Sequence, residues 1–220
     1  MIKQNILVAV DDVIFTIINN KLEILLIKRL LDPFKDHWAI PWGFVLENES
    51  IDEAAYRELE EETNVKDIYL EQLYTVWNPN RDPRWYVTSI SYLALAPKEK
   101  LTLKAGSDAK EAKFFPVKKL PKLAFDHKDI IKVALERLKW KLTYSNIAKF
   151  LLPDRFTLSQ LQKVYEIILE KKLDTRNFRK KIEKLSIIES TWEKEVWVTH
   201  RPALLYKFKH KNLVYLNEFL

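Results

Sequence analysis

The sequence predicts an α+β protein in two parts: a mixed sheet packed between helices, then a smaller unit of helices followed by strands. Three observations lead to this fold class. Strand-like apolar runs dominate the first 145 residues, helical spacing of apolar residues begins after Pro153, and short strand-like runs return from Ser186 onward. We therefore expect a first domain at residues 1–145, a linker at 146–155 and a second domain at 156–220.

The first domain opens with a hairpin and then combines helices with strands. The runs ILVAV and VIFTII precede a turn at Asn19-Asn20, and LEILLIKR returns from it. A long loop through DHWAIPWGFV leads to a helix that Ser50 and Glu53 begin as a capping box and Asn64 ends. Strands are expected at about 68–77, 85–96 and 112–117, and a last helix at about 128–142. This order predicts an α/β/α sandwich with a mixed sheet.

The second domain has the element order of a winged helix-turn-helix. Thr157 and Gln160 form a capping box for a helix with apolar residues at helical spacing, namely Leu158, Leu161, Val164, Tyr165 and Ile168. Asp174 caps a second helix whose buried face carries Phe178, Ile182 and Leu185. The runs that follow, SIIES, EVWVTH and ALLYKFK, have strand character.

The composition excludes several classes of protein. The 220 residues are 47% hydrophobic and 31% charged, as in an ordinary soluble globular protein. No apolar run approaches the roughly 18 residues of a membrane span, and Asp11 and Asp12 interrupt the N-terminal apolar run, unlike a signal peptide. The absence of cysteine excludes disulfides, thiolate catalysis and Cys-based zinc sites. We expect a cytoplasmic protein with no membrane partner.

The positive charge is concentrated in the second domain. Residues 1–150 carry 23 Lys and Arg against 22 Asp and Glu, whereas residues 151–220 carry 14 against nine. Seven basic and two acidic residues fall within Lys171–Lys184 alone. Such a local basic patch indicates a polyanionic partner.

The stretch RELEEETNV, residues 57–65, places four glutamates within five positions, although like charges one turn apart repel. On a helical projection with Ile51 at zero, the apolar stripe centres at about 15°, and Glu58 and Glu62 fall inside it. Glu61 lies at the edge of the stripe, while Glu53 and Glu60 point away and fit a solvated face. Two carboxylates on a packed face require a compensating cation. Mg²⁺ fits because it prefers carboxylate and phosphate oxygens, and arginines such as Arg57 are the alternative.

From Gly43 to Val65, the stretch GFVLENESIDEAAYRELEEETNV resembles the Nudix box, G-x5-E-x7-R-E-U-x-E-E-x-G-U with U an aliphatic residue. The resemblance implies a Nudix fold over the first domain and Mg²⁺- or Mn²⁺-dependent cleavage of a nucleoside diphosphate linked to another moiety. It implies that Glu58, Glu61 and Glu62 are metal-binding and catalytic. It also implies that Arg57 and Glu49 support these carboxylates and that Gly43 contributes to ligand binding.

Two positions depart from the Nudix pattern. Asn64 replaces the closing glycine and accepts the same left-handed backbone conformation. Trp42 stands where the family usually has the first of two glycines, and we expect this bulky side chain either to crowd the site or to fill it, with slow turnover at best.

The loop NRDPRWYVTS supplies further candidates for ligand binding. Arg81 and Arg84 are candidate diphosphate ligands because the guanidinium fork matches phosphate geometry. The alternative is a surface loop in which Asp82 pairs with an arginine. The aromatic residues that flank the loop are candidates for stacking on a base, or else for strand core: Trp77, Trp85 and Tyr86.

The second domain, FTLSQLQKVYEIILEKKLDTRNFRKKIEKL followed by HRPALLYKF, resembles the winged-helix module of Nudix-related transcriptional regulators, with His200 where that family often has glycine. Arg176 and Lys180 lie opposite the Phe178 face, at about 160° and 200° from it. Such a helix fits a DNA major groove, and an ordinary amphipathic surface helix is the alternative. The candidate DNA-binding residues are Arg176, Asn177, Arg179, Lys180, Lys181, Lys184 and Arg201.

These features predict a DNA-binding transcriptional regulator whose Nudix domain binds an ADP-ribose-like metabolite as its effector. We expect it to act as a homodimer on a roughly palindromic operator, because one recognition helix reads only a few base pairs. The alternative is a Mg²⁺-dependent Nudix pyrophosphohydrolase acting on ADP-ribose or a related nucleoside diphosphate derivative, which the intact glutamates permit.

Overall fold

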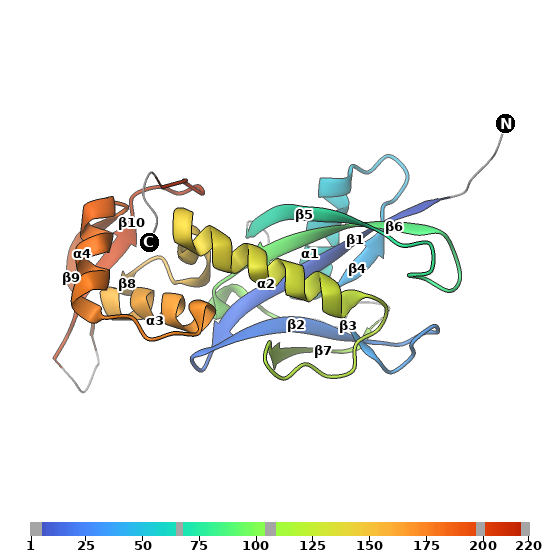
Figure 1. Ribbon diagram of the computed structural model, residues 1–220, viewed down its shortest axis with the longest axis horizontal. Helices are drawn as coiled ribbons and strands as arrows, with labels where there is room; N and C mark the ends of the chain where they lie inside the picture. The colour runs from blue at the N-terminus through green and yellow to red at the C-terminus, as the bar shows by residue number, and fades with distance from the viewer. Residues whose placement is uncertain (1–5, 65–67, 104–108, 197–200, 217–220) are drawn as a thin grey trace. The chain divides into compact units, whose positions relative to one another are not determined.

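The chain forms two compact units in its computed structural model, which describes residues 6–64, 68–103, 109–196 and 201–216 (Figure 1). The first unit contains Met1–Ile18 and Leu22–Leu135, and the second contains Asn19–Lys21 and Glu136–Leu220. The fold class is α+β, as predicted. None of the described helices is long and apolar enough to cross a membrane.

The first unit is built on a mixed sheet. Its strands are β1 (Leu7–Ile18), β2 (Lys21–Arg29), β3 (Trp38–Ala39), β4 (Trp42–Phe44), β5 (Tyr69–Trp77), β6 (Val87–Leu95) and β7 (Ala109–Pro116). The order is β3-β2-β1-β6-β5, with β4 pairing to β1 and β7 to β2. The β1–β6 pair is parallel, whereas β5–β6, β2–β7 and β1–β4 are antiparallel. Asn19 and Asn20 adopt φ angles of 49° and 60°, as a tight hairpin turn requires.

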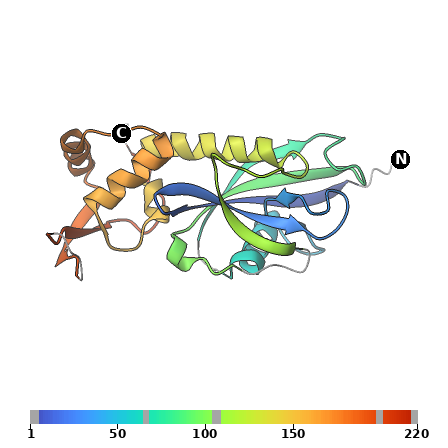
Figure 2. The same ribbon diagram turned by 90° about the horizontal axis from the view of Figure 1, so that it is seen from below.

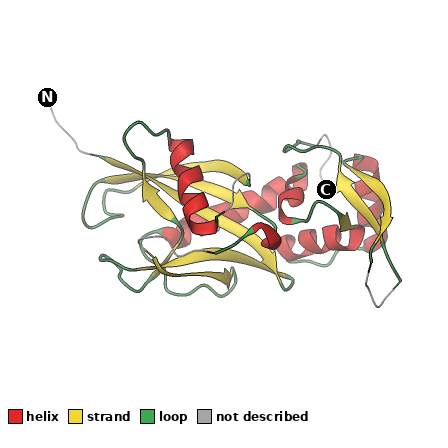
Figure 3. Ribbon diagram, turned by 180° about the vertical axis from the view of Figure 1, so that it is seen from behind, coloured by secondary structure: helices red, strands yellow, loops and turns green. Residues whose placement is uncertain are grey.

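Helix α1 (Ile51–Thr63) covers one face of this sheet, and the first half of α2 (His127–Tyr144) lies on the other (Figures 1 and 3). Ala54 and Ala55 of α1 pack on Val10 and Ile90, so small residues allow the helix to lie close to the strands. The predicted sandwich is therefore confirmed.

The predicted ends of α1 are confirmed. The Ser50 side chain accepts a hydrogen bond from the Glu53 N–H and the Glu53 carboxylate accepts one from the Ser50 N–H, which is the capping box. Asn64 ends the helix with φ 55° in the left-handed region. Ile51 was placed on the apolar stripe, but its 39% exposure shows that the packed face begins only at Ala54.

Two expectations for this unit need correction. The stretch DHWAIPWGFV is not only a loop, because it contains the short strands β3 and β4, which pair with β2 and β1. The strand expected at 112–117 begins earlier, at Ala109. Val65 of the Nudix box lies outside the described residues.

The second unit combines the end of α2 with three helical segments and a small sheet (Figure 2). Its elements are the 3-10 helix η2 (Ile147–Leu151), β8 (Phe156–Thr157), α3 (Leu158–Leu169), α4 (Thr175–Leu185), β9 (Ile188–Lys194) and β10 (Leu204–Phe208). The strand order is β8-β10-β9. Helix, helix and antiparallel strands follow in the order predicted for a winged helix.

The N-terminal caps of this unit are also confirmed, with Thr157 and Gln160 forming the box of α3 and Asp174 capping α4. Phe178 and Ile182 are buried, whereas Leu185 is only partly buried. The segment expected as a linker includes η2, with Ile147, Ala148 and Leu151 buried. Most of the expected strand EVWVTH, including His200, lies outside the described residues.

Candidate functional site

Helix α1 turns Glu58, Glu61 and Glu62 toward one cavity of about 350 Å³ in the first unit. The predicted orientations of Glu53, Glu58 and Glu62 are confirmed, since Glu62 is buried and the Glu58 side chain is 13% exposed, whereas Glu53 is exposed. Glu60, predicted on the solvated face with Glu53, is only partly exposed. Glu61, predicted at the edge of the stripe, has a side chain that is 52% exposed. The cavity wall opposite the helix comes from the loop and strands around it, namely Ile27, Arg29, Leu31, Trp42, Gly43, Phe44, Leu46, Arg84 and Trp85.

Gly43 leaves the space that the Glu58 carboxylate occupies. A Cβ atom built on Gly43 would lie 1.7 Å from Glu58 Oε1 and 2.2 Å from its carboxyl carbon. No side chain fits there unless Glu58 moves. The glycine of the Nudix box is therefore explained by close packing of a carboxylate on the backbone of β4.

Arg57 of α1 connects the helix to the chain segment that precedes it. Its Nε and Nη2 donate to the two carboxylate oxygens of Glu49 at 2.8 and 3.0 Å, and Nη2 also donates to the Phe44 carbonyl at 3.1 Å. Its Nη1 donates to Glu58 and lies 3.6 Å from Glu61 Oε1. Glu49 in turn accepts the Leu46 N–H, so this arginine fixes the loop before α1. The supporting role expected for Arg57 and Glu49 has this physical basis.

Two buried carboxyl groups lie close together on this side of the sheet. Burial raises the pKa of Glu58 above its ordinary value, although Arg57 acts in the opposite direction. Asp12 of β1 is fully buried on the same face of the sheet, and burial together with the nearby Glu58 raises its pKa well above the usual range. Within the described part of the chain, neither carboxylate oxygen of Asp12 has a hydrogen-bond partner.

These carboxylates have the chemistry of a divalent-cation site, because hard cations prefer oxygen ligands. The described residues contain no group of three or more His, Asp or Glu side chains already gathered closely enough to hold an ion. The glutamate oxygens are therefore of the type that binds a divalent cation, and they line one cavity. In this structure the Glu58 carboxylate instead accepts a hydrogen bond from Arg57.

Trp42 forms part of the cavity wall and leaves the cavity open. Its ring makes edge contacts with Phe44 and Phe125 at centroid distances of 5.3 and 6.1 Å. The Arg29 guanidinium lies 5.3 Å from the Trp42 centroid and 4.8 Å from that of Phe125. Trp42 therefore does not fill the site, although it narrows it compared with glycine.

The two loop arginines occupy different surroundings. Arg81 is 9% exposed and is not among the residues that line the cavity. Its guanidinium donates to Asp11 at 2.8 Å and to both oxygens of Asp126 at 2.8 and 3.1 Å. Arg84 lines the cavity, and Asp82 accepts two hydrogen bonds from its guanidinium, at 2.8 and 3.0 Å. The pairing of Asp82 with an arginine, kept as the alternative for this loop, is present.

Arg81 belongs to a buried network that the sequence did not reveal. Asp11 also accepts the Ser89 hydroxyl at 2.6 Å and lies 3.5 Å from His127 Nε2. His127 Nδ1 accepts the Ile40 N–H at 3.1 Å, so the ring proton is on Nε2 and faces Asp11. The sequence does contain one indication of this network, the adjacent Asp11 and Asp12 inside an apolar strand. Because successive strand residues point to opposite faces, one of the two must lie on each face of the sheet.

The aromatic residues around the loop are exposed. Trp77, Trp85 and Tyr86 have exposed fractions of 52%, 47% and 61%, so the alternative that they are strand core is wrong. Trp85 lines the cavity, with the Arg84 guanidinium 4.4 Å from its ring centroid and the Phe44 ring 6.0 Å away. A flat aromatic surface therefore stands beside a cation at the cavity wall.

Helix α4 of the second unit presents the other candidate site. Asp174 accepts the Asn177 N–H at 2.9 Å, which fixes the first turn, and Phe178 packs edge-on against Tyr165 with centroids 5.4 Å apart. The polar side chains of α4 that were assigned to DNA are all exposed, namely Arg176, Asn177, Arg179, Lys180, Lys181 and Lys184. Arg201 is exposed in the segment before β10.

Comparison with known proteins identifies both units. Residues 9–134 match the NUDIX domain model, and residues 148–208 match the model of the NrtR DNA-binding winged helix domain. The chain is 35% identical over 210 residues to an ADPR responsive transcriptional repressor, NtrR, of Acinetobacter baylyi, covering 92% of this chain and 82% of that protein. It is 46% identical over 134 residues to an ADP-ribose pyrophosphatase of Methanocaldococcus jannaschii, covering 61% of this chain and 74% of that protein.

The similarity in structure extends over nearly the whole chain. Shewanella oneidensis NrtR complexed with a 27mer DNA superposes with a TM-score of 0.85 at 34% identity, covering 97% of this chain and 99% of that one. The NUDIX domain of the same protein complexed with ADP ribose superposes with a TM-score of 0.55 at 36% identity, covering 63% of this chain and 90% of that one. This chain belongs to the NrtR family, in which a Nudix domain is joined to an NrtR winged-helix DNA-binding domain.

Proposed function

We propose that this protein is a transcriptional repressor that binds operator DNA through its winged helix and responds to ADP-ribose bound in its Nudix domain. The assignment is supported by family membership and by relatives that are named for DNA binding, repression and ADP-ribose. The observation that carries it is α4, which buries Phe178 and Ile182 and exposes five basic side chains.

The basic side chains of α4 have two roles in this proposal. Arg176 and Lys180 lie opposite the buried face and approach the base edges, where arginine pairs with guanine. Arg179, Lys181 and Lys184 lie on the flanks, where they neutralise phosphates and give an affinity that falls with salt. Useful specificity requires two half-sites, so we propose that a homodimer binds a roughly palindromic operator.

The Nudix cavity is the proposed effector site. Arg84 is one of the arginines that line it and is the proposed partner of the diphosphate, while Trp85 offers a face for the adenine base. The Arg81 guanidinium donates hydrogen bonds to Asp11 and Asp126. In this proposal, Arg81 fixes the loop that carries Arg84. Mg²⁺ or Mn²⁺ would be held by Glu58, Glu61 and Glu62, where it would neutralise diphosphate charge.

The regulator is tested by titrating promoter DNA and scrambled duplex with the full-length protein, with and without ADP-ribose and Mg²⁺. We expect tighter binding to the promoter and release by ADP-ribose. Arg176→Ala should lose about 1–3 kcal/mol on the promoter and much less on scrambled duplex. Equal affinity for both duplexes, unchanged by ADP-ribose, would contradict the proposal.

A second function is favoured by the intact glutamates and by the similarity to an ADP-ribose pyrophosphatase. We propose slow hydrolysis of ADP-ribose at this site, because Trp42 narrows the cavity beside Gly43. Trp42→Gly should raise the Mg²⁺-dependent rate, and Glu62→Gln should abolish it while the protein stays folded. Brisk turnover by the unaltered protein would instead make hydrolysis the main function.

A further inference from the structure

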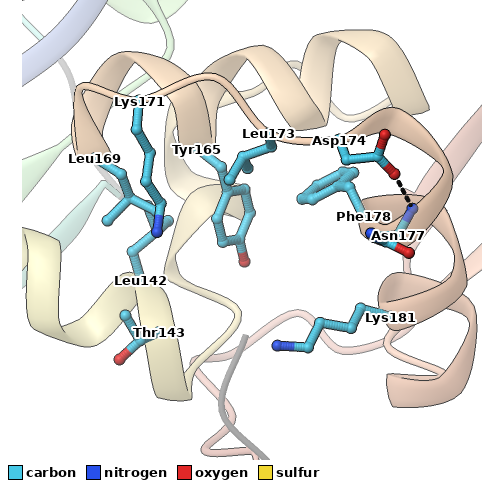
Figure 4. Close-up of a pocket in the computed structure, with 10 residues that line it drawn as sticks. All are labelled: Leu142, Thr143, Tyr165, Leu169, Lys171, Leu173, Asp174, Asn177, Phe178 and Lys181. Carbon is cyan, nitrogen blue, oxygen red and sulfur yellow. Dashed lines mark hydrogen bonds between the residues drawn. The ribbon is translucent and has the colours of Figure 1, made fainter.

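A second cavity lies inside the winged-helix unit, between the end of α2, the end of α3 and the start of α4 (Figure 4). Its volume is about 310 Å³, which is at the small end of the range for small-molecule sites. Its apolar wall consists of Leu142, Leu169, Leu173 and Phe178. This wall is separate from the Nudix cavity and shares no residue with it.

A tyrosine hydroxyl points into this cavity. Tyr165 is only 2% exposed, and in Figure 4 its hydroxyl is directed into the enclosed space. Among the residues that the structure describes, this hydroxyl has no hydrogen-bond partner, and burial raises its pKa above the ordinary value. The hydroxyl is therefore available to donate a hydrogen bond to an acceptor on a ligand.

The charged residues around the cavity favour an anion. Lys171 and Lys181 line it, and the Lys181 side chain points into the space in Figure 4. The only acidic lining residue that the structure describes is Asp174, and one of its oxygens already accepts the Asn177 N–H at 2.9 Å. Lys171 therefore provides a cation for an anionic ligand, next to an apolar wall that strengthens electrostatic attraction.

The wall of the cavity is fixed by local hydrogen bonds. Glu166 accepts the Leu173 N–H at 3.0 Å, and Gln162 donates to the Leu173 carbonyl at 3.0 Å. Lys139 of α2 lies 3.3 Å from Glu170, where α3 ends. A cavity held open in this way loses little conformational entropy on binding, which favours a ligand.

We propose that this cavity binds a small monoanion with an apolar body, of the class of medium-chain or aromatic carboxylates. The carboxylate accepts a hydrogen bond from the Tyr165 hydroxyl and pairs with Lys171. The apolar body packs on Leu142, Leu169, Leu173 and Phe178. The site is thus a second ligand site, chemically unlike one for a nucleoside diphosphate.

An anion bound in this cavity should also change the affinity for DNA, a consequence that rests on the proposed function. Asn177 and Lys181 line the cavity and belong to α4, the proposed recognition helix. An anion held against α4 places negative charge beside the surface offered to phosphates, so the occupied protein binds DNA more weakly. Linkage requires that DNA weaken binding of the anion by the same factor.

The site is tested by isothermal titration calorimetry of the full-length protein with octanoate, with 1-octanol as the probe that lacks the charge. We expect octanoate to bind at least tenfold more tightly than 1-octanol. Tyr165→Phe and Lys171→Met should each weaken octanoate about tenfold, since one removes only the hydroxyl and the other only the charge. Lys172→Met is the matched control, because Lys172 is exposed beside Lys171 and does not line the cavity.

The results test three claims separately: the anion site, its coupling to DNA binding, and the proposed function. Absence of octanoate binding, or binding that is equal in the wild type, Tyr165→Phe and Lys171→Met, would overturn the site. If the site is present, octanoate at saturating concentration should weaken promoter binding by the wild type and not by Lys171→Met. Unchanged promoter affinity would overturn the coupling alone, and failure of the ligand-free protein to prefer promoter DNA would overturn the proposed function alone.

Discussion

At the residue scale, the Nudix site depends on the absence of a side chain at Gly43. The Glu58 carboxylate lies where a Cβ atom would be, while its neighbours Arg57 and Glu49 hold the loop in place. The backbone at Gly43 has no positive φ angle, so its role is to provide space and not a special conformation.

Gly43→Ala should therefore impair the site far more than the fold. The new methyl group would displace the end of a flexible glutamate side chain, which costs little stability but moves a candidate metal ligand. We expect ADP-ribose to lose at least tenfold in Mg²⁺-dependent affinity, measured by calorimetry. Glu58→Gln should show the same loss without displacement, and retention of wild-type affinity in Gly43→Ala would refute the role of this packing.

The buried His127 should make folding stability depend on pH. Burial lowers its pKa below the usual 6.5, with the Asp11 carboxylate acting in the opposite direction. The unfolded chain therefore binds a proton that the folded chain does not, once the pH falls below about 6.5. Folding stability is full above that pH and decreases below it, by at most about 1.4 kcal/mol per pH unit for this group.

The measurement is urea unfolding at pH 7.5 and pH 5.5. His127→Asn keeps an acceptor for the Ile40 N–H and removes the titration, so its stability should fall less between the two values than that of the wild type. Equal losses in the two proteins would show that His127 does not contribute.

At the element scale, the ends of the helices were readable from sequence because caps are local. Ser50, Thr157 and Asp174 each accept the hydrogen bond expected from three residues downstream. The orientation of Glu58 and Glu62 was equally predictable, since it follows from helical periodicity alone. The Arg81–Asp11–Asp126 network was not, because it joins residues 45 and 70 positions apart whose pairing depends on the sheet. For the same reason, the sequence predicts a loop where β3 and β4 pair with distant strands.

The C-terminal cap of α1 gives a prediction with a matched pair of variants. Asn64 adopts φ 55°, a conformation that costs alanine about 1 kcal/mol or more and glycine almost nothing. Asn64→Ala should lower the thermal midpoint of the protein, whereas Asn64→Gly should leave it close to that of the wild type. A similar midpoint for both variants would argue against the cap as the cause.

At the scale of the whole molecule, the effector can act only if it binds the DNA-competent and DNA-incompetent arrangements with different affinities. The first unit ends at Leu135 and the second resumes at Glu136, yet α2 continues as one helix through both residues. We expect this helix to couple ADP-ribose binding to DNA binding, together with the 146–155 segment.

Glu136→Pro tests that coupling, because proline inside a helix removes a backbone hydrogen bond and costs about 3 kcal/mol. Glu136 is exposed, so the change falls on the helix backbone, and Glu136→Ala is the matched control that preserves it. In the proline variant we expect ADP-ribose and promoter DNA each to bind within a few-fold of wild-type affinity. ADP-ribose should no longer release the DNA, while it still does so in Glu136→Ala. Full release from the Glu136→Pro variant would show that an intact α2 is not needed for the response.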